Sequence, residues 1–185
     1  MSEKTYSAVV MTFNLRRTVF FDRMFNRNHV WKHRKRRAAE AIRAAGADFV
    51  GTQEGLHGMI AELVELLPEF AWIGEGRRGG KTDETNAVLY RKDRWYPEEC
   101  GTFWLSRTPE IPGSRGWGAV FPRICTWGLF RSIADSLARI ILFNTHLDHV
   151  SRRAREQGLL LPPLRLRLPS PRFRGRFPAP TCCCA

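Results

Sequence analysis

Residues 140–149 read Ile-Ile-Leu-Phe-Asn-Thr-His-Leu-Asp-His, a run of four apolar residues that stops abruptly at polar and titratable groups. A short, continuous apolar run of this kind predicts a strand that is buried on both faces. Two earlier apolar stretches end in the same way, the first before Asn14 and the second before Glu54. We therefore expect three strands that bring Asn14, Glu54 and His146 together at one end of one sheet.

Hydrophobic periodicity predicts alternating strands and helices between residues 6 and 161. The expected strands span 6–13, 48–53, 70–74, 87–90, 95–105, 122–130 and 139–145, and the fifth is interrupted near Pro97. The expected helices span 31–45, 56–67 and 151–161. Gly46 caps the first helix, and the second stops before Pro68. This alternation indicates an α/β (α+β) fold in which helices cover a sheet.

The composition changes after Leu161. Residues 162–184 contain only Leu, Arg, Pro, Ser, Phe, Gly, Ala, Thr and Cys, and proline recurs too often for a helix or a central strand. We therefore expect a domain at 1–161, followed by a low-complexity, disordered tail at 162–185 that has no stable packing from residue 165 onward.

The net charge of +12 is unevenly distributed along the chain. Residues 152–185 hold eight arginines and one acid and carry +7, so the first 151 residues carry +5. A modestly basic domain suits phosphorylated or polyanionic partners, although a solvated basic surface would give the same charge. The basic cluster at 32–37 could hold a phosphate backbone, but a solvated helix face is the simpler interpretation.

The five cysteines form no CxxC pair and have no zinc-ligand spacing. No apolar signal core precedes the first strand, and no apolar run approaches the roughly 18 residues of a membrane span. We therefore predict a reduced, cytoplasmic protein without a transmembrane segment. The sequence leaves its oligomeric state open.

An asparagine and a glutamate at neighbouring strand ends suit Mg²⁺, a hard cation that takes few protein oxygens and keeps room for water and phosphate. A nearby histidine that is held by an acid can protonate or stabilise a phosphoryl oxygen. Each motif also has a simpler interpretation on its own. Thr52-Gln53-Glu54 is typical of a strand before a turn, and Asn144-Thr145-His146-Leu147 is typical of a hydrogen-bonded core histidine.

The order and spacing of four motifs resemble the endonuclease/exonuclease/phosphatase superfamily, which includes DNase I-like nucleases, deadenylases, sphingomyelinases and inositol phosphatases. The four motifs are Met11-Thr12-Phe13-Asn14-Leu15, Thr52-Gln53-Glu54, Glu84-Thr85-Asn86-Ala87-Val88-Leu89-Tyr90-Arg91 and Asn144-Thr145-His146-Leu147. Further similarities between Phe103 and Trp127 resemble a bacterial-type subgroup of unassigned substrate. The resemblance covers roughly residues 6–161.

This resemblance implies a role for each matching residue. Glu54 would be the principal ligand of Mg²⁺, or of Mn²⁺, and Asn14 would lie beside the metal and the scissile phosphate. His146 would stabilise the transition-state phosphate or act as an acid, and Glu84 matches the family acid that orients this histidine. We expect a direct hydrogen bond between Glu84 and His146. The implied reaction is in-line attack of an activated water on a phosphoester of a nucleic acid, a phospholipid headgroup or a phosphorylated sugar.

The resemblance ends before the family domain does. The family fold is a DNase I-like, four-layer sandwich of two sheets with helices outside, and its second half supplies a Gly-Asp-Phe-Asn-like motif and a Ser-Asp-His motif. Neither motif is present, since no Asp follows Asp148 and no His follows His149. We therefore expect the N-terminal part of such a sandwich, C-terminally truncated, with an incomplete second half and impaired activity. The alternatives are a non-catalytic fragment and a basic nucleic-acid-binding protein.

Overall fold

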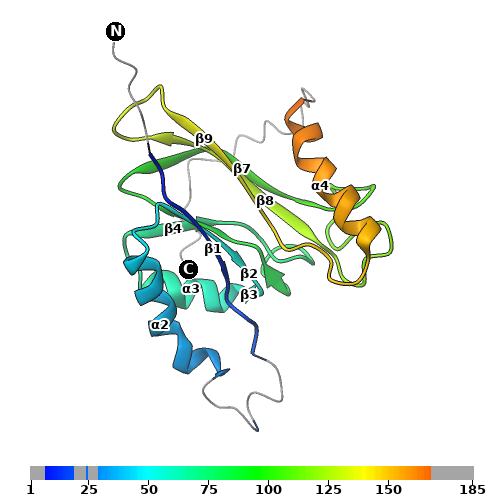
Figure 1. Ribbon diagram of the computed structural model, residues 1–185, viewed down its shortest axis with the longest axis horizontal. Coiled ribbons are helices and arrows are strands. Elements are labelled where there is room, and N and C mark those ends of the chain that lie inside the picture. Colours follow the sequence, from blue (N-terminus) through cyan, green and yellow to red (C-terminus); the bar gives the residue numbers. More distant parts are fainter. Residues whose placement is uncertain (1–6, 19–23, 25–28, 168–185) are drawn as a thin grey trace.

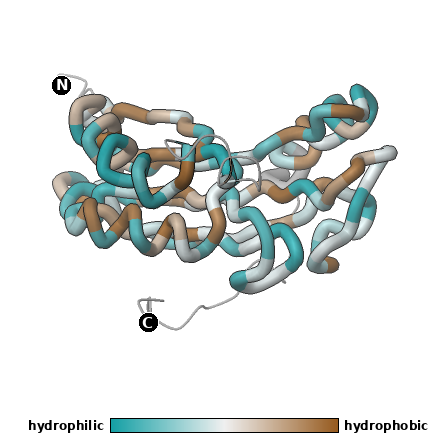
Figure 2. Tube along the Cα trace, turned by 90° about the horizontal axis from the view of Figure 1, so that it is seen from below, coloured by the Kyte–Doolittle hydropathy of each residue, from teal (hydrophilic) through white to brown (hydrophobic). Residues whose placement is uncertain are grey.

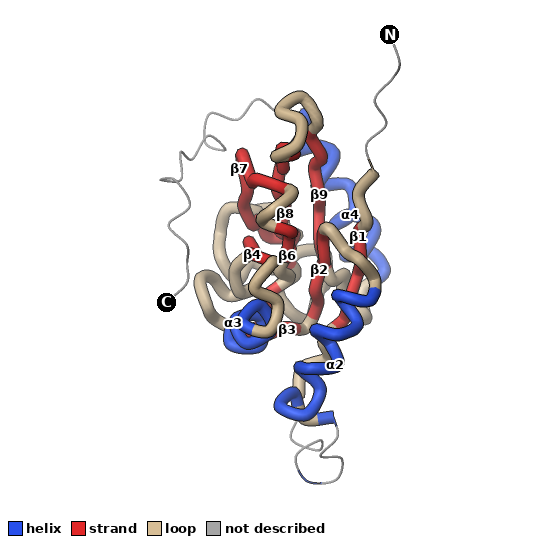
Figure 3. Tube along the Cα trace, turned by 90° about the vertical axis from the view of Figure 1, so that its left-hand side faces the viewer, coloured by secondary structure: helices blue, strands red, loops and turns tan. Residues whose placement is uncertain are grey.

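Two β-sheets face each other, and helices pack on their outer faces (Figure 1). The computed structural model describes residues 7–18, 24 and 29–167. Helices α2 (Trp31–Ala44) and α3 (His57–Glu65) form one outer layer, and helix α4 (Arg152–Arg167) lies on the opposite side. The strands lie between these helices (Figure 3), so the predicted layered α/β sandwich is confirmed.

The first sheet has four strands in the order β1-β2-β6-β4. Their bounds are Val10–Asn14 for β1, Phe49–Gln53 for β2, Val88–Arg91 for β6 and Phe70–Ile73 for β4. Strands β1 and β2 are parallel and are connected by α2, as parallel neighbours require a crossover. Their parallel register places Asn14 opposite Gln53, so both strands end at the same edge.

The second sheet is an antiparallel meander of three strands, β7-β8-β9. Strand β7 spans Trp95–Trp104, β8 spans Ile124–Ser132 and β9 spans Arg139–Thr145. The register of β7 shifts between Pro97 and Glu99, which is the predicted interruption. A small ribbon formed by β3 (Gly55–Leu56) and β5 (Glu84–Thr85) follows the end of β2.

The apolar core has one part between the sheets and one part under each helical layer. Between the sheets, the ring of Phe49 lies 5.1 Å from that of Trp95 and 4.9 Å from that of Phe130. On the outer face of the first sheet, Ile42 of α2 and Leu63 of α3 are fully buried in one cluster with Val50 and Leu89 of the sheet. Hydrophobic and hydrophilic residues alternate along the helices (Figure 2), as expected for elements that bury one face.

Most predicted elements lie where the sequence placed them, and β9 has the predicted bounds. The ribbon of β3 and β5 was not predicted, because its strands are too short to show a period. Helix α4 continues through Pro162 and Pro163 to Arg167, beyond the expected domain end at 161. Leu161 packs against the cluster of Phe103 and Leu105, which anchors this part of the helix. The predicted tail from residue 168 lies outside the described residues.

Strand β9 is less buried than its apolar sequence predicted. It lies at the edge of its sheet, and Asn144 is its only buried residue. Strand β1 is also an edge strand; its first residue, Val10, is 54% exposed, and Val9 just before it is 47% exposed. The prediction of a strand buried on both faces is therefore wrong for β9, because burial depends on neighbouring strands that the local sequence does not specify. None of the described helices is long and apolar enough to cross a membrane.

Candidate active site

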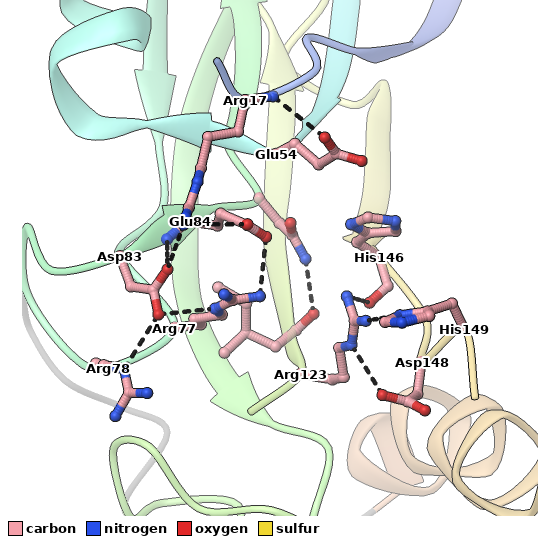
Figure 4. Close-up of polar contacts among 12 residues, drawn as sticks. Arg17, Glu54, Arg77, Arg78, Asp83, Glu84, Arg123, His146, Asp148 and His149 are labelled. Atoms are coloured by element: carbon pink, nitrogen blue, oxygen red, sulfur yellow. Dashed lines mark hydrogen bonds and ion pairs between the residues drawn. The ribbon is translucent and has the colours of Figure 1, made fainter. Parts of the chain in front are cut away.

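The predicted site residues come from both sheets and from the ribbon. Asn14 ends β1, Glu54 follows β2, Glu84 lies in β5, and His146 follows β9. Figure 4 shows the side chains of Glu54, Glu84 and His146 around one space, and both carboxylates act electrostatically on the imidazole. The expectation of one end of one sheet is wrong, because β9 belongs to the second sheet.

A buried asparagine joins the two sheets beside the site. From β9, Asn144 donates hydrogen bonds to the backbone carbonyls of Thr52 and Ala87, each at 2.9 Å, and accepts one from Gln53 Nε2 at 2.9 Å. The side chain of Asn144 approaches β2 so closely that position 51 has to be glycine, since a Cβ on Gly51 would lie 2.8 Å from Asn144 Oδ1. These contacts fix β2 against β9. Glu54 comes directly after Gln53, and His146 comes two residues after Asn144.

Glu54 is held by the first strand and the turn after it. Asn14 Nδ2 donates to Glu54 Oε1 at 2.8 Å, and the backbone N–H of Arg17 donates to Oε2 at 3.1 Å. Burial alone would raise the pKa of Glu54, but these two hydrogen bonds and the charges of His146 and Arg16 hold it below its ordinary value. Glu54 is therefore ionised at neutral pH.

The backbone around Glu54 adopts an unusual conformation. Glu54 has φ 58° and Arg16 has φ 51°, so two non-glycine residues occupy the left-handed region at the site. Such residues persist only where surrounding contacts fix them. Asn14 supplies one such contact, since its Oδ1 accepts a hydrogen bond from the Arg16 N–H at 2.8 Å. In this arrangement Asn14 orients the carboxylate through its nitrogen and the turn through its oxygen.

The carboxylate of Glu84 is hydrogen-bonded to an arginine and not to His146. Arg77 Nη1 donates to Glu84 Oε2 at 2.9 Å, and Arg17 Nη1 lies 3.6 Å from Oε1. The same Arg77 also pairs with Asp83 at 3.0 Å. No hydrogen bond joins Glu84 to His146, whose Nδ1 is buried without a partner among the described residues. The predicted Glu84–His146 bond is wrong for this structure, because a buried guanidinium beside Glu84 takes its carboxylate.

His146 lies in a loop that a buried arginine holds. Arg123 Nε lies 3.4 Å from Asp148 Oδ2, and Arg123 also approaches the His146 carbonyl at 3.4 Å and His149 Nδ1 at 3.0 Å. Asp148 in turn accepts hydrogen bonds from the Val150 and Ser151 N–H groups before α4. Burial and the charge of Arg123 lower the pKa of His146, against the opposite effect of Glu54 and Glu84. The imidazole is therefore neutral at pH 7.

Sequence reasoning missed the basic residues that surround these groups. A small hollow beside His146 is lined by Arg77, Glu84, Asn86 and Arg123, among others. Asn86 and Arg123 lie inside quoted motifs, but their side-chain partners come from distant segments: Asn86 Nδ2 donates to the Ile124 carbonyl at 3.0 Å. No local pattern in the sequence pairs these segments, so spacing alone could not have found the cluster.

The donors fit a hard divalent cation that keeps most of its water. Within residues 7–18, 24 and 29–167, no three His, Cys, Asp or Glu side chains gather as a closed protein site would need. One ionised carboxylate, supported by an amide, is the donor set by which Mg²⁺ binds through few protein oxygens. Asn14 as a direct ligand stays a prediction. An ionised carboxylate that can hold such a cation, beside a neutral histidine that can donate to a phosphoryl oxygen, has the groups that metal-assisted phosphoester hydrolysis needs.

Comparison with known proteins supports the same class. An endonuclease/exonuclease/phosphatase family protein from Bacteroides thetaiotaomicron is 34% identical over 87% of this chain and 59% of its own, with a TM-score of 0.82. The mannosyl-6-phosphatase of the same organism is 34% identical over 92% of this chain and 62% of its own, with a TM-score of 0.81. A family protein from Bacteroides vulgatus is 37% identical over 84% and 57%, with a TM-score of 0.76.

No family model and no curated protein matches the chain. In fold and sequence the chain matches solved members of the endonuclease/exonuclease/phosphatase superfamily over most of its own length. It spans less than two thirds of the length of each of them.

Proposed function

We propose that this chain carries the metal-binding part of a Mg²⁺- or Mn²⁺-dependent phosphoester hydrolase. The observation that carries the proposal is the carboxylate of Glu54, which Asn14 and the Arg17 N–H hold at 2.8 and 3.1 Å in the space that His146 also faces. Glu54 would hold the ion, and Asn14 would orient its carboxylate. A bound divalent ion neutralises charge on the phosphoryl oxygens and lowers the pKa of its water.

The protein groups supply charge and hydrogen bonds around the phosphate. Glu54 is ionised at neutral pH because its pKa is lowered, so no proton has to leave before a cation binds. His146 is neutral because its pKa is lowered, so it can donate a hydrogen bond to a phosphoryl oxygen. Arg77 and Arg123 line the hollow beside it and bring N–H donors to its wall, while their charges are paired with Asp83, Glu84 and Asp148.

A phosphorylated sugar is the substrate class that we propose first. One relative of 34% identity is a mannosyl-6-phosphatase. The hollow beside His146 presents two guanidinium groups, the carboxylate of Glu84 and the amide of Asn86, which together suit a phosphate and the hydroxyl groups of its leaving group. Nucleic acid and phospholipid headgroups are the competing substrates, and the assay below distinguishes them.

We infer that turnover by the 185 residues alone is slow. The sequence has no Asp after Asp148 and no His after His149. It therefore lacks the residues that would position the attacking water and give acid–base help. Such contributions are each commonly worth about 10² to 10⁴-fold. The chain would then be a hydrolase of impaired activity, which is the expectation from its sequence; a non-catalytic, metal-binding fragment is the alternative.

The test is hydrolysis of three phosphoesters with and without Mg²⁺ or Mn²⁺: mannose 6-phosphate, a single-stranded oligonucleotide and phosphocholine. The expected result is slow, metal-dependent release of phosphate from the sugar. Glu54→Gln and His146→Ala should abolish it, whereas Glu40→Gln, a change of an exposed glutamate on α2, should not. Product formation that Glu54→Gln leaves unchanged would refute the proposal, and preferential cleavage of the oligonucleotide would refute the substrate class.

A further inference from the structure

Arg34 on α2 makes three short hydrogen bonds, and all three go to backbone carbonyls. Its Nε donates to the His29 carbonyl, Nη1 to the Leu15 carbonyl and Nη2 to the Arg16 carbonyl, each at 2.7 Å. The guanidinium also lies 5.7 Å from the ring of Trp31, a residue that packs in the core. The side chain therefore ties the start of α2 to the turn that follows β1.

The bonded turn is the one that holds Glu54. Leu15 is fully buried, and its N–H donates to the Gln53 carbonyl at 2.9 Å. Arg16 has φ 51°, and the next N–H, that of Arg17, donates to Glu54 Oε2. A left-handed arginine is a strained conformation, so contacts on both sides have to fix it. Asn14 provides them on one side and Arg34 on the other.

We propose that Arg34 is a positioning residue for the metal-binding carboxylate, acting through the turn Leu15–Arg17 on the Arg17 N–H and Asn14. This inference rests on the proposed function, because it assumes that Glu54 is the ligand. The planar guanidinium of arginine can bond three carbonyls at once, whereas the ammonium of lysine is a point charge that cannot reproduce this fork. Arginine is therefore required here for its shape as well as its charge.

The test is binding of Mn²⁺ alone, measured by isothermal titration of the 185-residue chain. Glu54→Gln defines the heat that belongs to the site. Arg34→Ala and Arg34→Lys are compared with Arg36→Ala, a change of an exposed arginine two positions along the same helix. Loss of groups that orient a metal ligand commonly weakens binding about 10- to 100-fold, and we expect about 10-fold for both Arg34 variants and less than about twofold for Arg36→Ala.

A second readout follows the turn itself. The backbone amide of Arg17 should lose hydrogen-exchange protection in both Arg34 variants and keep it in Arg36→Ala, because only the former release the turn from α2. Arg34→Lys keeps the positive charge, so it carries the test if Arg34→Ala does not fold. A folded Arg34→Lys protein that binds Mn²⁺ as tightly as the parent would overturn the inference.

The remaining outcomes also decide the matter. If both Arg34 variants are unfolded by near-ultraviolet circular dichroism, Arg34 serves the whole fold and the positioning role is refuted. If the parent shows no Glu54-dependent heat, the proposed function fails and this inference fails with it. If the parent binds and the lysine variant binds equally well, the inference fails and the proposed function stands.

Discussion

Replacing Gly51 and Asn144 separately and together measures how the two sheets are joined beside the site. Asn144→Ala removes three hydrogen bonds between buried groups. At about 1 kcal/mol each, their loss lowers the free energy of unfolding by about 3 kcal/mol. Gly51→Ala alone places a Cβ 2.8 Å from Asn144 Oδ1 and 3.0 Å from Cγ, and overpacking of this kind costs about 1–3 kcal/mol.

The two changes should not be additive. In the Asn144→Ala background the obstructing amide is gone, so the added methyl of Gly51→Ala enters space that the asparagine vacated. We expect the double variant to be about 1–2 kcal/mol more stable than the sum of the single effects predicts, within the range found for residues in contact. The assay is urea unfolding of the four proteins, followed by circular dichroism and by tryptophan fluorescence.

A matched glycine provides the control. Gly58 lies in α3, and a Cβ there would meet nothing within 4 Å. Gly58→Ala should therefore stabilise the helix by about 0.5–1 kcal/mol and add simply to Asn144→Ala. If the effects of Gly51→Ala and Asn144→Ala on the free energy of unfolding also add within about 0.5 kcal/mol, the close packing of β2 on β9 is refuted.

Four further predictions concern pH, turnover and solubility. Arg123→Met should raise the pKa of His146 in an NMR titration, because it removes a charge that lowers this pKa; an unchanged value would contradict the contact. In the parent, the lowered pKa of His146 makes stability fall as pH drops below the ordinary value of 6.5 toward the folded value, since the unfolded chain binds the proton first. His146→Gln should reduce the dependence of the free energy of unfolding on pH in this range. Grafting the remaining segment of the mannosyl-6-phosphatase after residue 161 should raise phosphatase turnover by at least about 10²-fold, and equal rates would contradict the assignment of slow turnover to missing groups. Val10→Lys on the exposed edge strand should reduce self-association in light scattering, because charge on an edge blocks strand pairing.

The sequence was most informative where a strand or helix has a clear period and a clear end. It placed β9 and the start of α2 correctly, because an apolar run or an alanine-rich face is a local property. It could not assign β9 to a second sheet or show that β9 forms an edge, because strand neighbours come from distant parts of the chain. The two-residue strands of the ribbon were too short to show a period.

The same limit applies to the candidate site. The motifs pointed to Asn14, Glu54, Glu84 and His146, and the structure brings Glu54, Glu84 and His146 around one space. The partner of Glu84 was predicted wrongly, because Arg77 competes for its carboxylate from a glycine-rich loop without a periodic pattern. Arg34 was interpreted as part of a solvated helix face, yet its guanidinium bonds three carbonyls. Charge alone does not distinguish a solvated arginine from a bonded one.

The central claim is that Glu54 and His146 belong to one metal–phosphate site at the shared end of two sheets. Substoichiometric Mn²⁺ tests it most directly, because the paramagnetic ion broadens NMR signals of nearby nuclei. We predict that the imidazole signals of His146 and the amide signal of Arg17 broaden together and more strongly than those of exposed His33 on α2. Glu54→Gln should abolish the effect. A His146 signal that stays sharp while Arg17 broadens would contradict the shared site.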